Sequence, residues 1–191
     1  MKIKIFKKME IILLRHGKPD VELKGYLNAN DIKQLTLKYA QSGVQDFPPD
    51  NLKNRFNACY VVCSDLARST QSARKLGVNE VHLSDALFKE TGIPHFDRGV
   101  IKMPVTVWLM VLRVMWLFGF KKNGESFSRA KNRAQDATNK LIELAQENEN
   151  VILVGHGLMN RLIAKQLRLK NWQGPSSPGK KHWEFARYTS T

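Results

Sequence analysis

Three short runs of apolar residues place the strongest constraint on how this chain can fold. They are MEIILL at 9–14, ACYVVC at 58–63 and VILVG at 151–155. A strand with one face in water alternates apolar and polar residues, whereas a strand covered on both faces is apolar throughout. The three runs therefore predict buried parallel strands, and a parallel sheet needs helices on both of its faces.

Helical patterns separate these runs. Between 124 and 146 the apolar residues recur at alternating spacings of three and four, which predicts an amphipathic helix. Further elements are expected at 30–42, 68–77 and 157–167, as helices, and at 81–83 and 182–189, as strands. This alternation predicts the α/β class, as a three-layer α/β/α sandwich with a mostly parallel central sheet, in a single domain over residues 1–191.

The charge of the chain favours anionic partners. Its 191 residues include 31 Lys and Arg against 17 Asp and Glu, for a formal net charge of +14. Such an excess suits nucleic acid, an anionic membrane surface or a phosphorylated small molecule. The basic residues are scattered, however, and the sequence has no aromatic–basic motif of the RNA-binding kind, so a nucleic-acid partner is not expected.

The N-terminus and the two cysteines bear on where the protein works. A basic leader at 1–8 precedes the first strand without a small-residue cleavage site, so we expect no signal peptide and a cytoplasmic protein. Cys59 and Cys63 lie four residues apart in an apolar run. There we expect buried thiols on one face of a strand, rather than a disulfide or a metal cluster.

Polar residues follow each predicted strand. Arg15 and His16 follow the first run, and Arg68 lies shortly after the second. His156 follows the third run, and Glu90 follows the weak strand between them. Because ligands of open α/β sheets bind at the carboxyl ends of the strands, we expect these side chains to converge on one site.

These residue types suit the transfer of a phosphoryl group. A neutral imidazole such as that of His16 can attack phosphorus and form a phosphohistidine. Arg15 and Arg68 offer rigid forks of donors that match phosphate oxygens. His156 lies between two glycines, so it can approach the phosphate closely and add another hydrogen bond.

Such a reaction also needs a carboxylic acid that protonates the leaving oxygen. Glu90 is the candidate for this role, and Asp85 is the alternative. The remaining histidines, His82, His95 and His182, are expected to be structural or exposed.

Five motifs in the expected order make the chain resemble the histidine phosphatase superfamily, also called phosphoglycerate-mutase-like. They are LLRHGKP, SDLARSTQSA, LFKE, NGES and LVGHG. By position, the resemblance implies that His16 is the nucleophile and Glu90 the proton donor. It implies a phosphate pocket made of Arg15, Arg68 and His156. It also implies an enzyme that needs no metal and no organic cofactor.

The chain departs from this family in two places. After RHG many members continue with a Thr and then an Asn that touch the phosphate, whereas this chain reads KPDVELKG. Either Lys18 or Asn28 is expected to compensate as a substrate-binding residue. The stretch between Glu90 and Gly124 is compact and apolar, unlike the long substrate-binding insertions of mutases. Both departures favour a phosphatase over a mutase.

The family inserts a cap over its active site where this chain has residues 91–124. Within this segment, 104–118 predicts a helix in which only Thr106 and Arg113 are polar. The helix is short for a bilayer span. Three partners could shield this apolar helix from water. They are the protein's own core, a second subunit docked on 104–118, or a membrane contacted peripherally with the aid of Lys102, Lys121 and Lys122. A cap of this kind also implies a substrate with an apolar portion beside its phosphate.

The leading interpretation is a metal-independent phosphomonoester hydrolase that acts on a small phosphorylated substrate through a phosphohistidine. Two alternatives use the same fold: phosphoryl transfer of the phosphoglycerate-mutase type, and a non-catalytic protein that binds anions or regulates. The intact set of site residues argues against the non-catalytic alternative. A nucleic-acid binder is motivated by the net charge alone.

Overall fold

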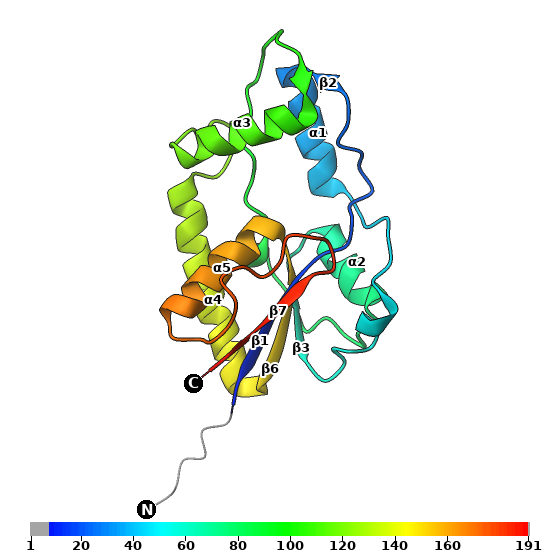
Figure 1. Ribbon diagram of the computed structural model, residues 1–191, viewed down its shortest axis with the longest axis vertical. Coiled ribbons are helices and arrows are strands. Elements are labelled where there is room, and N and C mark those ends of the chain that lie inside the picture. The colour runs from blue at the N-terminus through cyan, green and yellow to red at the C-terminus, as the bar shows by residue number, and fades with distance from the viewer. Residues whose placement is uncertain (1–7, 191) are drawn as a thin grey trace, which may run out of the picture.

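A computed structural model of the chain describes residues 8–190, so residues 1–7 of the expected basic leader lie outside the described part. Its strands include β1 (Glu10–Arg15), β3 (Tyr60–Cys63), β4 (Leu83–Ser84), β6 (Asn150–Gly155) and β7 (Phe185–Thr189). These form a five-stranded sheet in the order β4-β3-β6-β1-β7 (Figure 1). Neighbouring strands are parallel except at the edge, where β7 pairs with β1 in the antiparallel direction. The mostly parallel sheet predicted from the apolar runs is confirmed.

Alternate residues of the central strands build two separate cores. Ile11 and Leu13 pack against α4 (Phe127–Asn148) and α5 (Gly157–Leu169). Ile12 and Leu14 point to the opposite face, which is covered by α2 (Ala67–Lys75). None of the four is more than 1% exposed. The central strands are apolar at consecutive positions because both faces of the sheet are covered, which confirms the three-layer sandwich.

A smaller unit lies beyond the carboxyl ends of the parallel strands (Figure 1). It consists of α1 (Ala29–Gln41), α3 (Val105–Leu117), and a two-stranded ribbon of β2 (Tyr26–Leu27) with β5 (Met103–Pro104). We call these elements the α1–α3 unit. Its own small core contains Ala29, Ile32, Trp108 and Leu112. Residues 26–41 and 103–117 are therefore packed together although they lie far apart in the sequence. They lie over the edge of the sheet where the polar residues were expected to meet.

Local capping sets the limits of the helices. The helix expected from 124 starts instead at Phe127, because the Ser126 hydroxyl accepts a hydrogen bond from the backbone N–H of Arg129. Two short 3-10 helices, η1 (Asp50–Leu52) and η2 (Ala86–Phe88), lie in the connections.

The apolar stretch at 104–118 forms α3, as predicted. Its last turn holds Trp116, which is fully buried. The indole Nε1 donates to the carbonyl oxygen of Glu125 at 2.5 Å, and the ring meets Phe127 edge-on at 5.0 Å. These contacts fasten the end of α3 to the start of α4. Among the helices of residues 8–190, none is long and apolar enough to cross a membrane.

Replacing Trp116 with alanine should lower the free energy of unfolding by about 3–5 kcal/mol, because a large buried side chain would leave a cavity. Phe118 offers a matched control two residues away, since it is 89% exposed. We expect Phe118→Ala to change the free energy of unfolding by no more than about 0.5 kcal/mol. Urea unfolding measures both, and equal losses would contradict this placement of α3.

Candidate active site

β1, β3 and β6 end at one edge of the sheet, below the α1–α3 unit (Figure 1), and the expected site residues end these strands or follow them. The rings of His16 and His156 have centroids 4.9 Å apart. Arg15, Arg68 and Glu90 line one cavity of about 440 Å³, which neither imidazole lines, and the charges of Arg15 and Arg68 act on both imidazoles. The structure therefore brings together the five residues that were expected to take part in catalysis.

His16 is buried and electrically neutral. Its Nδ1 lies 2.6 Å from the carbonyl oxygen of Gly17. Because a carbonyl oxygen can only accept, Nδ1 carries the proton and Nε2 keeps its electron pair. Burial, with smaller contributions from the charges of Arg68 and Arg15, lowers the pKa of His16 to about 3. At neutral pH the imidazole is thus able to act as a nucleophile without a separate base.

Arg68 is held rigidly although it is almost fully buried. Its Nη1 donates to the carbonyl oxygens of Tyr39 at 2.8 Å and Ala40 at 3.3 Å. Its guanidinium carbon lies 4.8 Å from the centre of the Tyr39 ring. The end of α1 therefore sets the direction of this guanidinium, even though Arg68 itself belongs to α2.

Arg15 crosses the start of α5 at close range. Its Nη1 donates to the carbonyl oxygen of Lys180 in the connection before β7. A Cβ atom at Gly157 would lie only 3.3 Å from Nε of Arg15. The glycine after His156 thus gives the guanidinium room to lie across the turn.

His156 is fully buried and is oriented by Ser64. The Ser64 hydroxyl lies 2.6 Å from Nε2 of His156, and it accepts a hydrogen bond from the backbone N–H of Leu66 at 3.3 Å. The hydroxyl proton is therefore free to be donated to Nε2, which leaves the ring proton on Nδ1. Burial, and next the neighbouring His16, lower the pKa of His156 well below its usual value.

Five buried side-chain nitrogen or oxygen atoms have no hydrogen-bond partner among the described residues, and three of them are nitrogen atoms of the expected site residues. They are Nε of Arg15, Nε of Arg68 and Nδ1 of His156. Buried polar groups are nearly always hydrogen-bonded, so three unpaired donors in one place indicate a site for an acceptor. A phosphoryl group fits, because it spreads negative charge over three oxygens.

Glu90 reaches the site from the connection after η2. Its Oε1 accepts hydrogen bonds from the backbone N–H groups of Thr91 at 2.9 Å and Met159 at 3.1 Å. Its Oε2 accepts one, from Leu158 at 3.2 Å. The carboxyl group is thereby fixed at the N-terminus of α5, directly after His156. Asp85 is exposed and does not line the cavity, and its side chain caps η2 by accepting from the N–H of Leu87.

Lys18 and Asn28, the expected substitutes for the missing Thr and Asn of the family, do not line the cavity. Asn28 caps α1 by accepting from the N–H of Asp31 at 3.0 Å. Lys18 has an exposed side chain, and its backbone N–H donates to Asp46 at 2.7 Å. That either of them binds substrate stays a prediction.

His182 is a site neighbour that the sequence did not reveal. Its ring centroid lies 5.4 Å from that of His16, and its Nδ1 donates to the carbonyl oxygen of His16 at 3.1 Å. Burial, and next the charge of Arg15, lower the pKa of His182. It reaches the site because β7 pairs with β1, a long-range contact with no local sequence signal. His82 is exposed, as expected, and His95 does not line the cavity.

Most of the cavity is lined by apolar side chains, in contrast to the charged side chains of Arg15, Arg68 and Glu90. Leucine and isoleucine side chains line it from several elements: Leu23, Leu35, Leu66, Ile93 and Leu109. From α3, the cavity receives Leu109 and Arg113, and Nη1 of Arg113 donates to the Thr91 hydroxyl at 3.1 Å. A ligand bound here would meet cations at one end and hydrocarbon along its sides.

The two cysteines lie on the α2 side of the sheet. Cys63 is buried, Cys59 is half-buried against the same core, and both are free thiols. Burial raises the pKa of Cys63 to about 11, so the thiol is unreactive at neutral pH. Residues 8–190 contain no group of three or more His, Cys, Asp or Glu side chains that could hold a metal ion.

The lowered pKa values make the stability of the fold depend on pH. His16 binds a proton near pH 3 in the folded chain but near its ordinary 6.5 in the unfolded chain. The unfolded state therefore binds more protons, and the free energy of unfolding should fall as the pH drops from 6.5 to about 5. His16→Asn should reduce this slope by up to about 1.4 kcal/mol per pH unit. Urea unfolding at several pH values tests this, and an unchanged slope would contradict a neutral, buried His16.

Solved structures share this fold. The mycobacterial glucosyl-3-phosphoglycerate phosphatase superposes with a TM-score of 0.59 at 18% identity, over 95% of this chain and 90% of that one. The α-ribazole phosphatase from Shigella flexneri superposes with a TM-score of 0.54 at 19% identity, over 83% of this chain and 79% of that one. A search of curated proteins finds no match. At such identities the likeness shows the fold alone.

The sequence itself matches one family over most of its length. The family model of the histidine phosphatase superfamily, branch 1, matches residues 11–178. This span contains the five residues that meet at the edge of the sheet, and its fold is that of the phosphatases named above. The chain belongs to the histidine phosphatase superfamily, branch 1.

Proposed function

We propose that this protein is a phosphomonoester hydrolase that works through a phosphohistidine on His16. One observation carries the proposal: three site residues near the neutral imidazole of His16 have buried nitrogen atoms that lack a hydrogen-bond partner within residues 8–190. A nucleophile for phosphorus and donors for the phosphoryl oxygens are thus held in one place before any substrate binds. Such preorganised donors are the main source of catalysis in phosphoryl transfer.

In the first step, Nε2 of His16 attacks phosphorus while the bond from phosphorus to the leaving oxygen breaks. Arg15, Arg68 and His156 bind the oxygens of the phosphoryl group as its charge shifts. Glu90 gives its proton to the leaving oxygen, so an alcohol departs. Oε2 is the better placed oxygen to carry that proton, since it accepts one N–H hydrogen bond and Oε1 accepts two.

In the second step, water attacks the phosphohistidine. Glu90, now a carboxylate, accepts a proton from that water, while the bond between phosphorus and Nε2 breaks. Inorganic phosphate leaves, and both His16 and Glu90 return to their starting forms. The two guanidinium groups supply the positive charge for both steps, so the proposal includes activity without an added metal ion.

The cavity supports hydrolysis of a small substrate with an apolar portion. Its volume is about 440 Å³, and hydrocarbon side chains form most of its walls. In this proposal, residues 91–124 act as the cap, with Leu109 of α3 contacting the part of the substrate beyond the phosphate. A suitable panel combines aryl and alkyl phosphates with glucosyl-3-phosphoglycerate and α-ribazole phosphate, the compounds named for the two similar structures.

His16→Ala should abolish phosphate release from p-nitrophenyl phosphate, because no other group would take the phosphoryl group. Arg68→Ala should raise the barrier by about 3 kcal/mol, since one donor fork would be lost from the transition state. His82→Ala and Arg74→Ala are matched controls, because both residues are exposed and outside the cavity. A near-normal rate for His16→Ala would exclude the phosphohistidine. Inactive wild-type protein on the whole panel would favour the non-catalytic anion-binding alternative.

Glu90→Gln should slow the hydrolysis of alkyl phosphates far more than that of p-nitrophenyl phosphate, because nitrophenolate leaves without protonation. Comparing kcat on the two substrates separates a chemical role from a structural one. Asp85→Asn is the control, and its rates should match those of the wild type. Equal slowing of both substrates by Glu90→Gln would mean that Glu90 only caps α5.

A further inference from the structure

The solvent side of α3 carries no charged residue. Three exposed apolar residues of α3, three or four positions apart, and the residue that caps the helix form what we call the outer face of α3: Met110, Val114, Leu117 and Phe118. They are 61%, 46%, 53% and 89% exposed, respectively. Surface helices ordinarily present polar or charged side chains to water, and contiguous exposed apolar surface marks a contact with another molecule.

The other sides of α3 are already occupied. Trp108, Leu112 and Trp116 are buried within the protein. Leu109 and Arg113 line the cavity of the candidate active site. The outer face is therefore the side of the helix that remains available to a partner.

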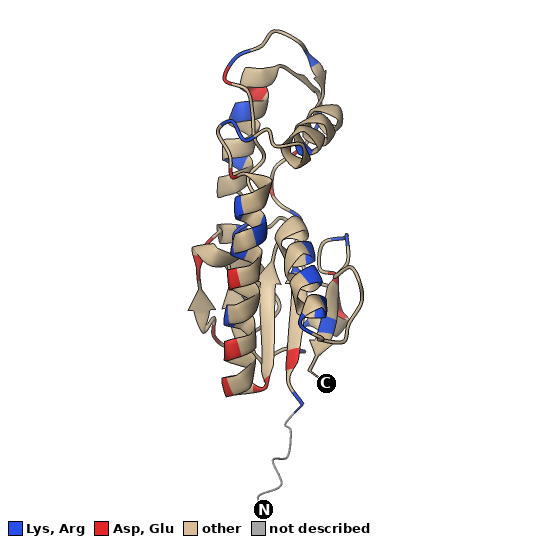
Figure 2. Ribbon diagram, turned by 90° about the vertical axis from the view of Figure 1, so that its left-hand side faces the viewer, with Lys and Arg blue, Asp and Glu red and all other residues tan. Residues whose placement is uncertain are grey.

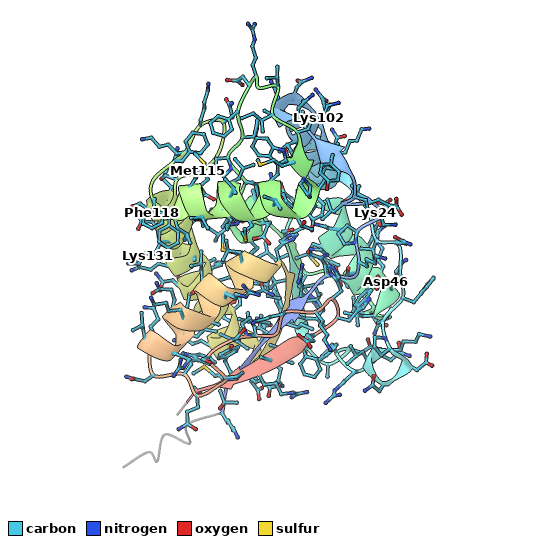
Figure 3. All side chains as sticks on the ribbon, turned by 45° about the horizontal axis from the view of Figure 1, so that its top comes forward. Lys24, Asp46, Lys102, Met115, Phe118 and Lys131 are labelled. Carbon is cyan, nitrogen blue, oxygen red and sulfur yellow. The ribbon has the colours of Figure 1, made fainter. Side chains whose placement is uncertain are left out.

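Positive charge surrounds the end of this face. Lys121 follows α3 closely, and Arg129 and Lys131 lie in the first turns of α4, which packs against the end of α3. Figure 3 shows Phe118 and Lys131 at the same edge of the molecule. Within residues 8–190, none of these three cations forms an ion pair.

The nearby acids are already neutralised. Asp97 and Glu125 are the two acids of residues 91–131. Asp97 pairs with Lys122 at 3.0 Å, and Glu125 pairs with Arg133 at 2.6 Å. Along α4, moreover, three of the four basic residues lie in the half next to α3, and the acids lie farther along the helix (Figure 2). The surroundings of the outer face thus carry a net positive charge.

We propose that the outer face of α3 docks on an anionic lipid bilayer. Leu117 and Phe118 enter the boundary between headgroups and acyl chains, and Lys121, Arg129 and Lys131 bind the phosphates of the headgroups. The helix lies flat on the surface, because 13 residues span about 20 Å, which is too short to cross the hydrocarbon core. This docking is separate from the proposed hydrolysis. It would bring α3, which lines the cavity with Leu109 and Arg113, close to the membrane.

Charge favours a lipid surface over a second copy of the chain. A twofold dimer places the same patch of both subunits in contact. The three cations of one subunit would then lie near those of the other, which is repulsive where the interface excludes water. An anionic bilayer offers apolar contact for the helix and opposite charge for the cations at once.

Sedimentation of the full chain with vesicles tests this docking. We expect binding to vesicles that contain phosphatidylglycerol, little binding to pure phosphatidylcholine, and release as salt is raised. Phe118→Ser should weaken binding about tenfold or more. A tenfold change in affinity corresponds to about 1.4 kcal/mol, and burial of a large apolar side chain contributes more than that. Lys121→Glu combined with Lys131→Glu should weaken it as well.

Two matched variants control for nonspecific effects. Phe47 is 70% exposed and follows Asp46, which Figure 3 shows at the edge opposite Phe118. Phe47→Ser should leave vesicle binding unchanged. Lys165 is exposed on α5, and Lys165→Glu should weaken binding less than the double charge reversal beside α3.

Several outcomes would overturn the docking. They are no binding to anionic vesicles, an equal loss for Phe47→Ser and Phe118→Ser, or a dimer in light scattering that needs Phe118 while vesicles are ignored. Hydrolysis of p-nitrophenyl phosphate in solution should be normal in all these variants. An inactive wild type that still binds vesicles would contradict the proposed function and leave the docking supported.

Discussion

The parallel pairing of β1 with β6 is the constraint on which the candidate active site depends. In this register Arg15 lies opposite Gly155, so His16 and His156 leave the sheet side by side. A shift of one residue would turn every side chain of β1 to the other face. The apolar residues from Ile11 to Leu14 prevent such a shift, since each already fills a core on its own side of the sheet. Core packing thus fixes the distance between the two imidazoles.

Burial keeps His16 neutral, but it also makes the charge of Arg68 energetically unfavourable. Taking His16 out of water keeps the ring neutral, as a nucleophile must be. The same burial disfavours the charge of Arg68, whose pKa it lowers. Tyr39 offsets part of this cost with its ring and its carbonyl oxygen. An anion would offset more, because it would pair with donors that the protein leaves unbonded; phosphate or its analogues should therefore stabilise the folded state.

Much of the fold could be predicted from sequence because its main signals are local. An uninterrupted apolar run identifies a strand covered on both faces, and the polar residues after it identify the edge where ligands bind. The α4 boundary was predicted three residues too early, because the cap at Ser126 is set by one hydrogen bond that the apolar spacing does not report. The hydrogen bonds of Lys18 and Asn28 are likewise set by local backbone and capping geometry, which their positions after RHG do not report. His182 was missed because an antiparallel pairing between distant segments brings it there.

That antiparallel pairing also affects the order in which the protein becomes functional. The backbone N–H of Arg15 donates to Glu184, its carbonyl oxygen accepts from Trp183, and its guanidinium donates to Lys180. The residue beside His16 is thus held by residues that come far later in the chain. Domains fold as units, and residues 180–189 must be synthesised before this one can close around β1. Until that segment has been made, a nascent chain carries the His16 motif without the partners that orient Arg15, so the candidate site should be complete only after residues 180–189 have been synthesised.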